Sequence, residues 1–243
     1  MDRILAMDRG NDSLKAALME NGVITRRWRG GDAAGMISDS NPSMIAFSSV
    51  VPGFSAGLAG IAREAGVMQV LEISGEMAMP FAIPLERPGK VGPDRLCAAC
   101  GVIAEGAKEA VIVDAGTALT VDLLDSSGFR GGCIFPGGRL LAGSLAGGTA
   151  VLPLVDISGP AGMPPGLDTE DAIGKGIFWG FAGAAGELVR RTLEAAGKDL
   201  PVYLTGGGAH LLEELLGVEP RVRPDLVLAG IFHLAGLEDS GTG

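Results

Sequence analysis

Apolar and polar positions alternate along the chain in a way that predicts short strands interspersed with helices. Residues 3–9 and 110–114 are the clearest buried strands. Further strands are predicted over residues 14–20, 23–28, 43–51, 117–124, 129–135 and 202–205. Helical periodicity covers residues 54–65, 92–105, 169–196, 209–216 and 225–235. This mixture predicts an α/β fold.

The chain also contains an internal repeat. One hairpin begins at Asp8-Arg9-Gly10 and turns at Gly22, and a later one begins at Asp114-Ala115-Gly116 and turns at Gly128. The Asp and the turn glycine are 14 residues apart in both hairpins. A unit repeated in this way predicts two related lobes, each opening with a β-meander. We place them at residues 1–108 and 109–243.

The composition and net charge of the chain exclude or disfavour several classes of protein. Hydrophobic residues make up 47% and charged residues 20%, which excludes a disordered chain. The net charge of −10 disfavours a nucleic-acid partner. Residues 40–62 are uncharged, but prolines, glycines and serines interrupt them, so no membrane span is predicted. With three cysteines and no apolar leader at the N-terminus, the sequence predicts a cytoplasmic protein.

The two Asp-x-Gly turns are the first candidate site. Glycine lets backbone N–H groups approach an anion closely, and a carboxylate at the end of a buried strand can hold a metal ion. Two such turns facing each other across a cleft would grip a polyphosphate and its Mg²⁺. The alternative is that Asp8 and Asp114 each cap a turn.

Two further segments have the residue types that bind substrates. Gly92-Pro93-Asp94-Arg95 opens a predicted helix, where Arg95 could take a carboxylate and Asp94 could accept a hydroxyl proton. A plain helix N-terminus is the alternative. Thr205-Gly206-Gly207-Gly208 joins a predicted strand to a predicted helix. Without side chains, these glycines would let a base or a phosphate lie against the backbone. The alternative is that the segment is only a turn. Neither a Walker loop nor a dinucleotide fingerprint occurs in the sequence.

Other patterns favour structural roles. Residues 53–57 match the G-x-S-x-G elbow of hydrolases, but Pro52 and the absence of an oxyanion motif favour an ordinary turn. Cys97 and Cys100 lie on an apolar helix and are predicted to be packed thiols. His210 and His233 are predicted to be surface or satisfied core residues.

Taken together, these segments resemble the type III pantothenate kinases in order and spacing, over nearly the whole chain. The specific segments are Asp8-Arg9-Gly10-Asn11, Gly92-Pro93-Asp94-Arg95 and Asp114-Ala115-Gly116-Thr117. Less specific support comes from residues 131–137, residues 149–153, Thr169 and Thr205-Gly206-Gly207. The resemblance implies duplicated ribonuclease-H-like lobes with mixed sheets, as in actin, Hsp70 and the sugar kinases. It implies ATP-dependent phosphorylation of pantothenate to 4'-phosphopantothenate, the first step of coenzyme A biosynthesis.

The resemblance also assigns roles residue by residue. Asp94 would be the general base, and Asp114 would hold a monovalent cation, K⁺ or NH₄⁺. Pantothenate would be bound by Gly92, Pro93, Asp94, Arg95 and, across a homodimer interface, Thr169. ATP and its Mg²⁺, for which Asp8 is a candidate ligand, would be bound by Asp8, Arg9, Gly10, Asn11, Asp12, Ser13, Leu14, Lys15, Thr117, Gly206 and Gly207.

Two positions depart from the family pattern. Asp12 stands where the family usually has Thr, and a carboxylate near ATP phosphates is repulsive unless a cation lies between them. Leu85 stands where the family tends to have an aromatic residue. These departures favour an alternative in which the chain is a catalytically weak regulatory relative that binds nucleotide or pantothenate.

Overall fold

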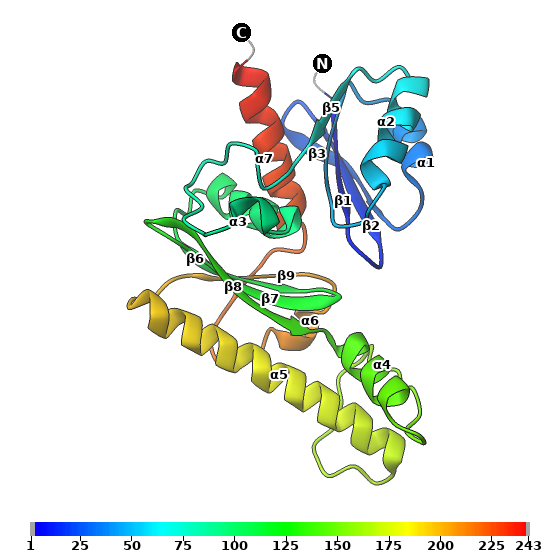
Figure 1. Cartoon of the computed structure of the whole chain (residues 1–243), viewed down its shortest axis with the longest axis vertical. Coiled ribbons are helices and arrows are strands. Elements are labelled where there is room, and N and C mark those ends of the chain that lie inside the picture. The colour runs from blue at the N-terminus through cyan, green and yellow to red at the C-terminus, as the bar shows by residue number, and fades with distance from the viewer. Residues whose placement is uncertain (1–2, 242–243) are drawn as a thin grey trace. The chain divides into compact units, whose positions relative to one another are not determined.

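The computed structural model describes residues 3–241, and the chain forms two compact units (Figure 1). Unit 1 contains the chain up to Lys108, residues 126–129 and the chain from Asp225 onward. Unit 2 contains Glu109–Asp125 and Arg130–Pro224. The division into lobes of residues 1–108 and 109–243 stays a prediction, because a spatial grouping does not test which segments fold on their own.

Unit 1 is built on a five-stranded mixed sheet in the order β3-β2-β1-β4-β5. Its strands are β1 (Arg3–Arg9), β2 (Leu14–Glu20), β3 (Val23–Arg29), β4 (Met44–Ser49) and β5 (Gln69–Glu72). The first three form an antiparallel meander, and β4 runs parallel to β1. The predicted hairpin at Asn21-Gly22 is confirmed, with both residues at positive φ as such a turn requires.

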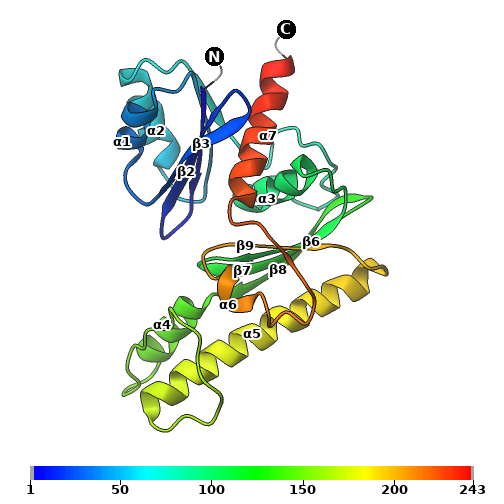
Figure 2. The same ribbon diagram turned by 180° about the vertical axis from the view of Figure 1, so that it is seen from behind.

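Helices cover both faces of the unit 1 sheet. Its helices are α1 (Ala33–Ser40), α2 (Phe54–Glu64), the short 3₁₀ helix η1 (Pro88–Lys90), α3 (Pro93–Ala104) and α7 (Leu226–Gly241). Figure 2 shows α1 and α2 on one face and α7 on the other. Leu5, Met7 and Phe47 are buried beneath α1 and α2. On the opposite face α3 and α7 touch so closely that a Cβ at Gly230 would overlap the carbonyl of Cys97.

Unit 2 repeats the same strand order. Its sheet is β10-β9-β6-β7-β8, formed by β6 (Ala110–Ala115), β7 (Ala118–Asp125), β8 (Gly128–Pro136), β9 (Val202–Thr205) and β10 (Arg221–Val222). In each sheet the first strand lies between the second and the fourth, and the fourth is parallel to it. This shared order confirms the predicted duplication.

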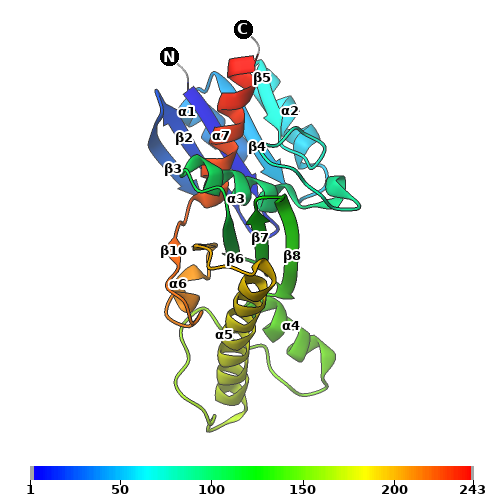
Figure 3. The ribbon, with the colours of Figure 1, turned by 90° about the vertical axis from the view of Figure 1, so that its left-hand side faces the viewer.

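The helices of unit 2 are α4 (Gly138–Gly148), α5 (Thr169–Ala196) and the short α6 (Ala209–Leu212). Phe181, Ala185 and Val189 of α5 pack against the sheet. The N-terminal part of α5 instead packs on α4 and the following loop, through Ile173 and Ile177 (Figure 3).

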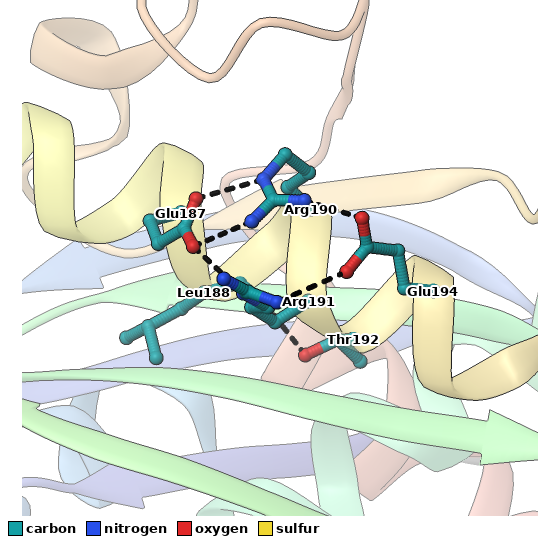
Figure 4. Close-up of polar contacts among 6 residues, drawn as sticks. All are labelled: Glu187, Leu188, Arg190, Arg191, Thr192 and Glu194. Carbon is teal, nitrogen blue, oxygen red and sulfur yellow. Dashed lines mark hydrogen bonds and ion pairs between the residues drawn. The ribbon is translucent and has the colours of Figure 1, made fainter.

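An exposed ion-pair network runs along the C-terminal half of α5 (Figure 4). Arg190 donates to both carboxylate oxygens of Glu187, at 2.8 and 2.6 Å, and also pairs with Glu194. Hydrogen bonds from Arg190 and Arg191 lower the pKa of Glu187 to about 2. Pairs at this helical spacing stabilise helices only modestly, because water and salt screen the charges of exposed side chains. The displaced pKa of Glu187 therefore reflects helix stabilisation rather than a functional site.

Some elements differ from the sequence-based predictions. The helix predicted over residues 209–216 ends at Leu212, and the chain continues in turns in which the N–H of Leu215 donates to Leu212, three residues back. The last helix continues beyond residue 235 to Gly241. The sequence pattern did not predict five elements of the structure: α1, β5, η1, α4 and β10.

Within residues 3–241 no helix combines the length and apolar character that crossing a membrane requires. The cytoplasmic location stays a prediction.

Candidate active site

Asp8 occupies the C-terminal part of β1, between β2 and β4. Its Cα is paired with Lys15 on one side and Ser48 on the other. The Ser48 hydroxyl donates to Oδ1 of Asp8 at 2.8 Å, and both side chains are buried. The end of the strand therefore presents a carboxylate that is held in place from a neighbouring strand.

Burial dominates the electrostatics of Asp8. Loss of hydration raises the pKa of its carboxyl, and the nearby Asp94 carboxylate raises it further. The hydrogen bond from Ser48 and the charge of Lys15 act in the opposite direction but do not cancel the effect of burial on the pKa. The folded unit 1 thus brings Lys15 and Asp94 within electrostatic reach of Asp8.

The rest of the first predicted phosphate loop is a tight turn between β1 and β2. The N–H of Gly10 donates to the carbonyl of Ser13 at 3.1 Å, while Asn11 and Asp12 are exposed. The side chain of Leu14 is buried in the core, so only the backbone of this residue is available to a ligand at the turn. Arg9, Ser13 and Lys15 are half-buried.

The segment Gly92-Pro93-Asp94-Arg95 does open a helix, α3, with Gly92 at the N-cap and Pro93 in the first turn. Oδ1 of Asp94 accepts the N–H of Arg95 at 2.9 Å. A Cβ at Gly92 would lie 2.5 Å from that same oxygen. Glycine at this position therefore leaves the space in which the Asp94 carboxylate sits.

In unit 2, Asp114 and the glycine loop come together. Asp114 is the next-to-last residue of β6, where its Cα pairs with Thr120 of β7 and Thr205 of β9. Gly206 follows Thr205 at φ +95°, and a Cβ there would lie 2.5 Å from the carbonyl oxygen of Ala115 and would overlap the Asp114 carboxylate. Gly208 donates its N–H to Ala115 at 2.8 Å. The second Asp-x-Gly turn therefore rests directly on the predicted nucleotide loop.

Thr117 lies in the same turn, half-buried. The N–H of Gly137, just before α4, donates to its carbonyl at 3.1 Å. Gly207 is exposed and has open space around its Cα. Thr169 is placed elsewhere in unit 2: it is exposed and begins α5, beside the N-cap Asp168. The predicted site residues thus form one group in unit 1, one group in unit 2, and Thr169.

The competing patterns are structural in this fold. The Ser55 hydroxyl donates to a carboxylate, Glu72 Oε1, at 2.6 Å. Cys97 and Cys100 are buried free thiols, as predicted, and burial raises the pKa of Cys100 to about 12. Among the described residues no group of three or more His, Cys, Asp or Glu side chains is placed to hold a metal ion. His210 is exposed near the Gly207 carbonyl, and His233 is half-buried on α7.

Sequence reasoning missed two residues near the unit 1 group. Ser48 pairs with Asp8 across the sheet, and the signal was a polar residue near the end of the predicted strand 43–51. Phe129, at the start of β8, lies under the guanidinium of Arg95. The resemblance expects an aromatic residue at position 85; the chain has Leu85 there, and the stacked rings in this unit belong to Phe81 and Phe129.

Comparison with known proteins matches these features to one family. A sequence model of the type III pantothenate kinases matches residues 4–191. The type III pantothenate kinase of Paramagnetospirillum magneticum is 31% identical over 250 residues, covering 95% of this chain and 96% of its own. That of Dehalococcoides mccartyi strain 195 is 30% identical, with 95% and 96% covered.

Solved structures share the fold at low identity. The ROK hexokinase of Thermus thermophilus aligns with a TM-score of 0.52 and 14% identity, covering 98% of this chain and 99% of its own. Component A of (R)-2-hydroxyglutaryl-CoA dehydratase from Acidaminococcus fermentans gives 0.53 and 16%, with 96% of each chain covered. These neighbours support the predicted actin-like and sugar-kinase-like fold class.

Proposed function

Because the chain belongs to the type III pantothenate kinase family, we propose that its two groups of site residues divide one phosphoryl transfer between them. The protein is a phosphotransferase that uses ATP to phosphorylate pantothenate in coenzyme A biosynthesis. The observation that carries the assignment of roles is the grouping of Asp8, Lys15 and Asp94 in unit 1.

Asp94 is the general base in this proposal. Its carboxylate accepts the proton of the primary hydroxyl of pantothenate while that oxygen attacks the γ-phosphorus of ATP, and the bond from this phosphorus to the β–γ bridging oxygen breaks so that ADP leaves. The position is suited to the task, because the helix start and Gly92 fix where the carboxylate lies. Arg95, one residue further, takes the substrate's own carboxylate through its forked N–H donors.

ATP is bound by residues from both units. In unit 1 the backbone N–H groups of the turn from Asp8 to Lys15 and the Lys15 ammonium offset phosphate charge. In unit 2 Thr117 donates to a phosphate, and the bare backbone of Gly206 and Gly207 lets the nucleotide lie close. Phosphoryl transfer depends mostly on such positioning and charge neutralisation.

The residues present fit two cations. Mg²⁺ that arrives with ATP needs only one or two protein carboxylates, and Asp8 is a buried one beside a second acid. A monovalent cation takes oxygen ligands, and Gly206 lets the Asp114 carboxylate and the Ala115 carbonyl share one small space. Both cations supply positive charge that screens the triphosphate. Measuring the rate with and without K⁺ tests the second site.

The proposed enzyme works as a homodimer. Large apolar side chains are exposed around α4 and the loop before α5, including Val151 at 87%, Leu154 at 71% and Leu167 at 88%. Contiguous exposed apolar surface marks interaction sites. Thr169 begins α5 directly after this loop, and in this proposal it contacts pantothenate that is bound by the partner.

Replacing Asp94 by Asn tests the assignment of the base. General-base assistance contributes on the order of 10²- to 10⁴-fold, so turnover should fall by that factor while ATP affinity stays within about twofold. Turnover is measured by coupled ADP release with pantothenate, and affinity by calorimetry. Asp39→Asn, the same change at an exposed site on α1, is the control. Wild-type turnover in Asp94→Asn would contradict the role.

A further inference from the structure

The hydrogen bond between Ser48 and Asp8 is set by the sheet of unit 1. The two Cα atoms are paired across the parallel strands β4 and β1. Because successive side chains of a strand point to opposite faces, Ser48 and Asp8 share the face opposite Met7 and Phe47, which lie in the core beneath α1 and α2. Ser48 is 0% exposed, and its hydroxyl donates to Oδ1 of Asp8 at 2.8 Å. The bond is therefore shielded from water, and strand pairing holds both of its ends.

A contact from α3 fixes the direction of this bond. Cys97 is fully buried, and its thiol forms a side-chain hydrogen bond with Ser48. Burial raises the pKa of the thiol well above its ordinary value, and Cys100, Asp8 and Asp94 raise it further. The thiol therefore keeps its proton and can donate it to the Ser48 oxygen. A serine hydroxyl has only one proton, so that proton goes to Asp8.

This arrangement suits a carboxylate that binds a cation through one oxygen. A hydrogen bond to the other oxygen orients such a ligand, and losing a partner of this kind typically costs 10- to 100-fold in metal affinity. Within residues 3–241, the side-chain hydrogen bond to the Asp8 carboxylate comes from Ser48 and ends on Oδ1, which leaves Oδ2 for a cation. A buried serine needs no carboxylate to be satisfied: Ser40, equally buried, donates to the backbone carbonyl of Met36.

We propose that Ser48 is a positioning residue for Asp8, holding Oδ1 so that Oδ2 is presented to the Mg²⁺ that accompanies ATP. The proposal rests on the proposed function, in which Asp8 is a ligand of that Mg²⁺. Ser48 touches neither ATP nor the cation in this account. Its loss should therefore weaken the part of ATP binding that depends on Mg²⁺ and leave the rest unchanged.

The test compares the binding of ATP to the full-length protein in Mg²⁺ and in EDTA, at one K⁺ concentration. Calorimetry gives both dissociation constants, and the EDTA value divided by the Mg²⁺ value measures how much Mg²⁺ contributes. Ser48→Ala removes the hydroxyl with little change in size, and we expect this ratio to fall about tenfold. The dissociation constant in EDTA should stay within about twofold. A wild-type ratio in folded Ser48→Ala would overturn the proposal.

Control variants separate positioning from general damage. Ser40→Ala removes an equally buried hydroxyl from unit 1, one that donates to a backbone carbonyl at 2.6 Å, and should keep the wild-type ratio even if the Tm falls. An equal fall of the ratio in Ser40→Ala would overturn the proposal, because lost stability would then account for it. Ser48→Cys has only a weak donor in place of the hydroxyl and carries the test, with a lowered ratio expected, if Ser48→Ala does not fold.

Asp8→Asn distinguishes the two levels of the proposal. If Asp8→Asn weakens ATP binding in Mg²⁺ but the folded Ser48 variants bind ATP as the wild type does, Ser48 does not position Asp8 and the role of Asp8 stands. If Asp8→Asn itself binds ATP in Mg²⁺ with wild-type affinity, Asp8 does not hold the cation, and both assignments are overturned.

Discussion

Asp8 shows how a single residue can serve the site at a cost to the fold. It is 9% exposed, and burial raises the pKa of its carboxyl. Between the ordinary pKa and this raised value, the folded protein holds a proton that the unfolded chain has released. Stability contributed by Asp8 is therefore greatest at acidic pH, falls as pH rises through this interval, and stays reduced at neutral pH.

Asp8→Asn should accordingly stabilise the protein without ligands at neutral pH. The amide removes the buried charge and keeps an oxygen that can accept the Ser48 hydroxyl. Stabilising substitutions of this kind commonly add about 0.5–2 kcal/mol, which corresponds to roughly 1–8 °C in Tm for a chain of this size. Thermal unfolding at neutral and acidic pH measures it, and the gain should shrink in acid. An equal or lower Tm at neutral pH would contradict the burial argument.

The candidate acids could be identified residue by residue from the sequence, but their partners could not. Asp8, Asp94 and Asp114 stand in short motifs whose residue types carry the chemistry. Ser48 reaches Asp8 only because β4 pairs with β1. Phe129 reaches Arg95 only because residues 126–129, at the tip of the β7–β8 hairpin, belong to unit 1. Such contacts between distant segments leave no local pattern.

At the level of elements, the turn after β6 and the loop after β9 pack directly against each other. Gly206 lies against Asp114 and Ala115, and Gly208 is bonded to Ala115. Any change in the glycine loop is therefore transmitted to the second acidic turn.

Gly206→Ala should destabilise the protein by about 2 kcal/mol or more. The residue sits at φ +95°, which L side chains rarely adopt, and the added methyl would overlap the Asp114 carboxylate. Gly207→Ala is the matched control, because its Cβ would meet nothing within 4 Å and its φ is not in that range. Urea unfolding measures both. Equal stability of the two variants would show that the close approach is not required.

Long elements with regular patterns were predictable, and short or glycine-rich ones were not. The strands of both meanders and the long helix α5 carry clear periodicity. Helix α4 has four glycines in eleven residues, which mask its helical pattern. The strands β5 and β10 are only four and two residues long, too short for alternation to be visible.

At the scale of the whole molecule, the repeated strand order explains how one chain supplies two acidic turns. The duplication was visible in the sequence as the equal spacing of the two hairpins. The sequence did not predict that α7 and residues 126–129 group with unit 1, because this grouping depends on packing between distant segments, such as that of Gly230 on Cys97.

The exposed apolar loop predicts a dimer in solution. Sedimentation velocity should give about twice the chain mass of 24.6 kDa. Leu154→Asp places a charge on this surface and should yield a single-chain mass with a raised KM for pantothenate, because Thr169 would lose its partner. Val23→Asp, at an exposed apolar position on β3, is the control. A wild-type mass of one chain would contradict the dimer.

We propose that Asp8 and Asp114 both contribute to the binding of one ATP, and a double-mutant cycle on ATP affinity measures whether they do. Calorimetry with Mg²⁺ present should find one ATP per wild-type chain and about tenfold or greater weakening in both Asp8→Asn and Asp114→Asn. The double variant should show a coupling of about 0.5–3 kcal/mol between them. Wild-type or tighter ATP binding in either single variant would contradict the claim.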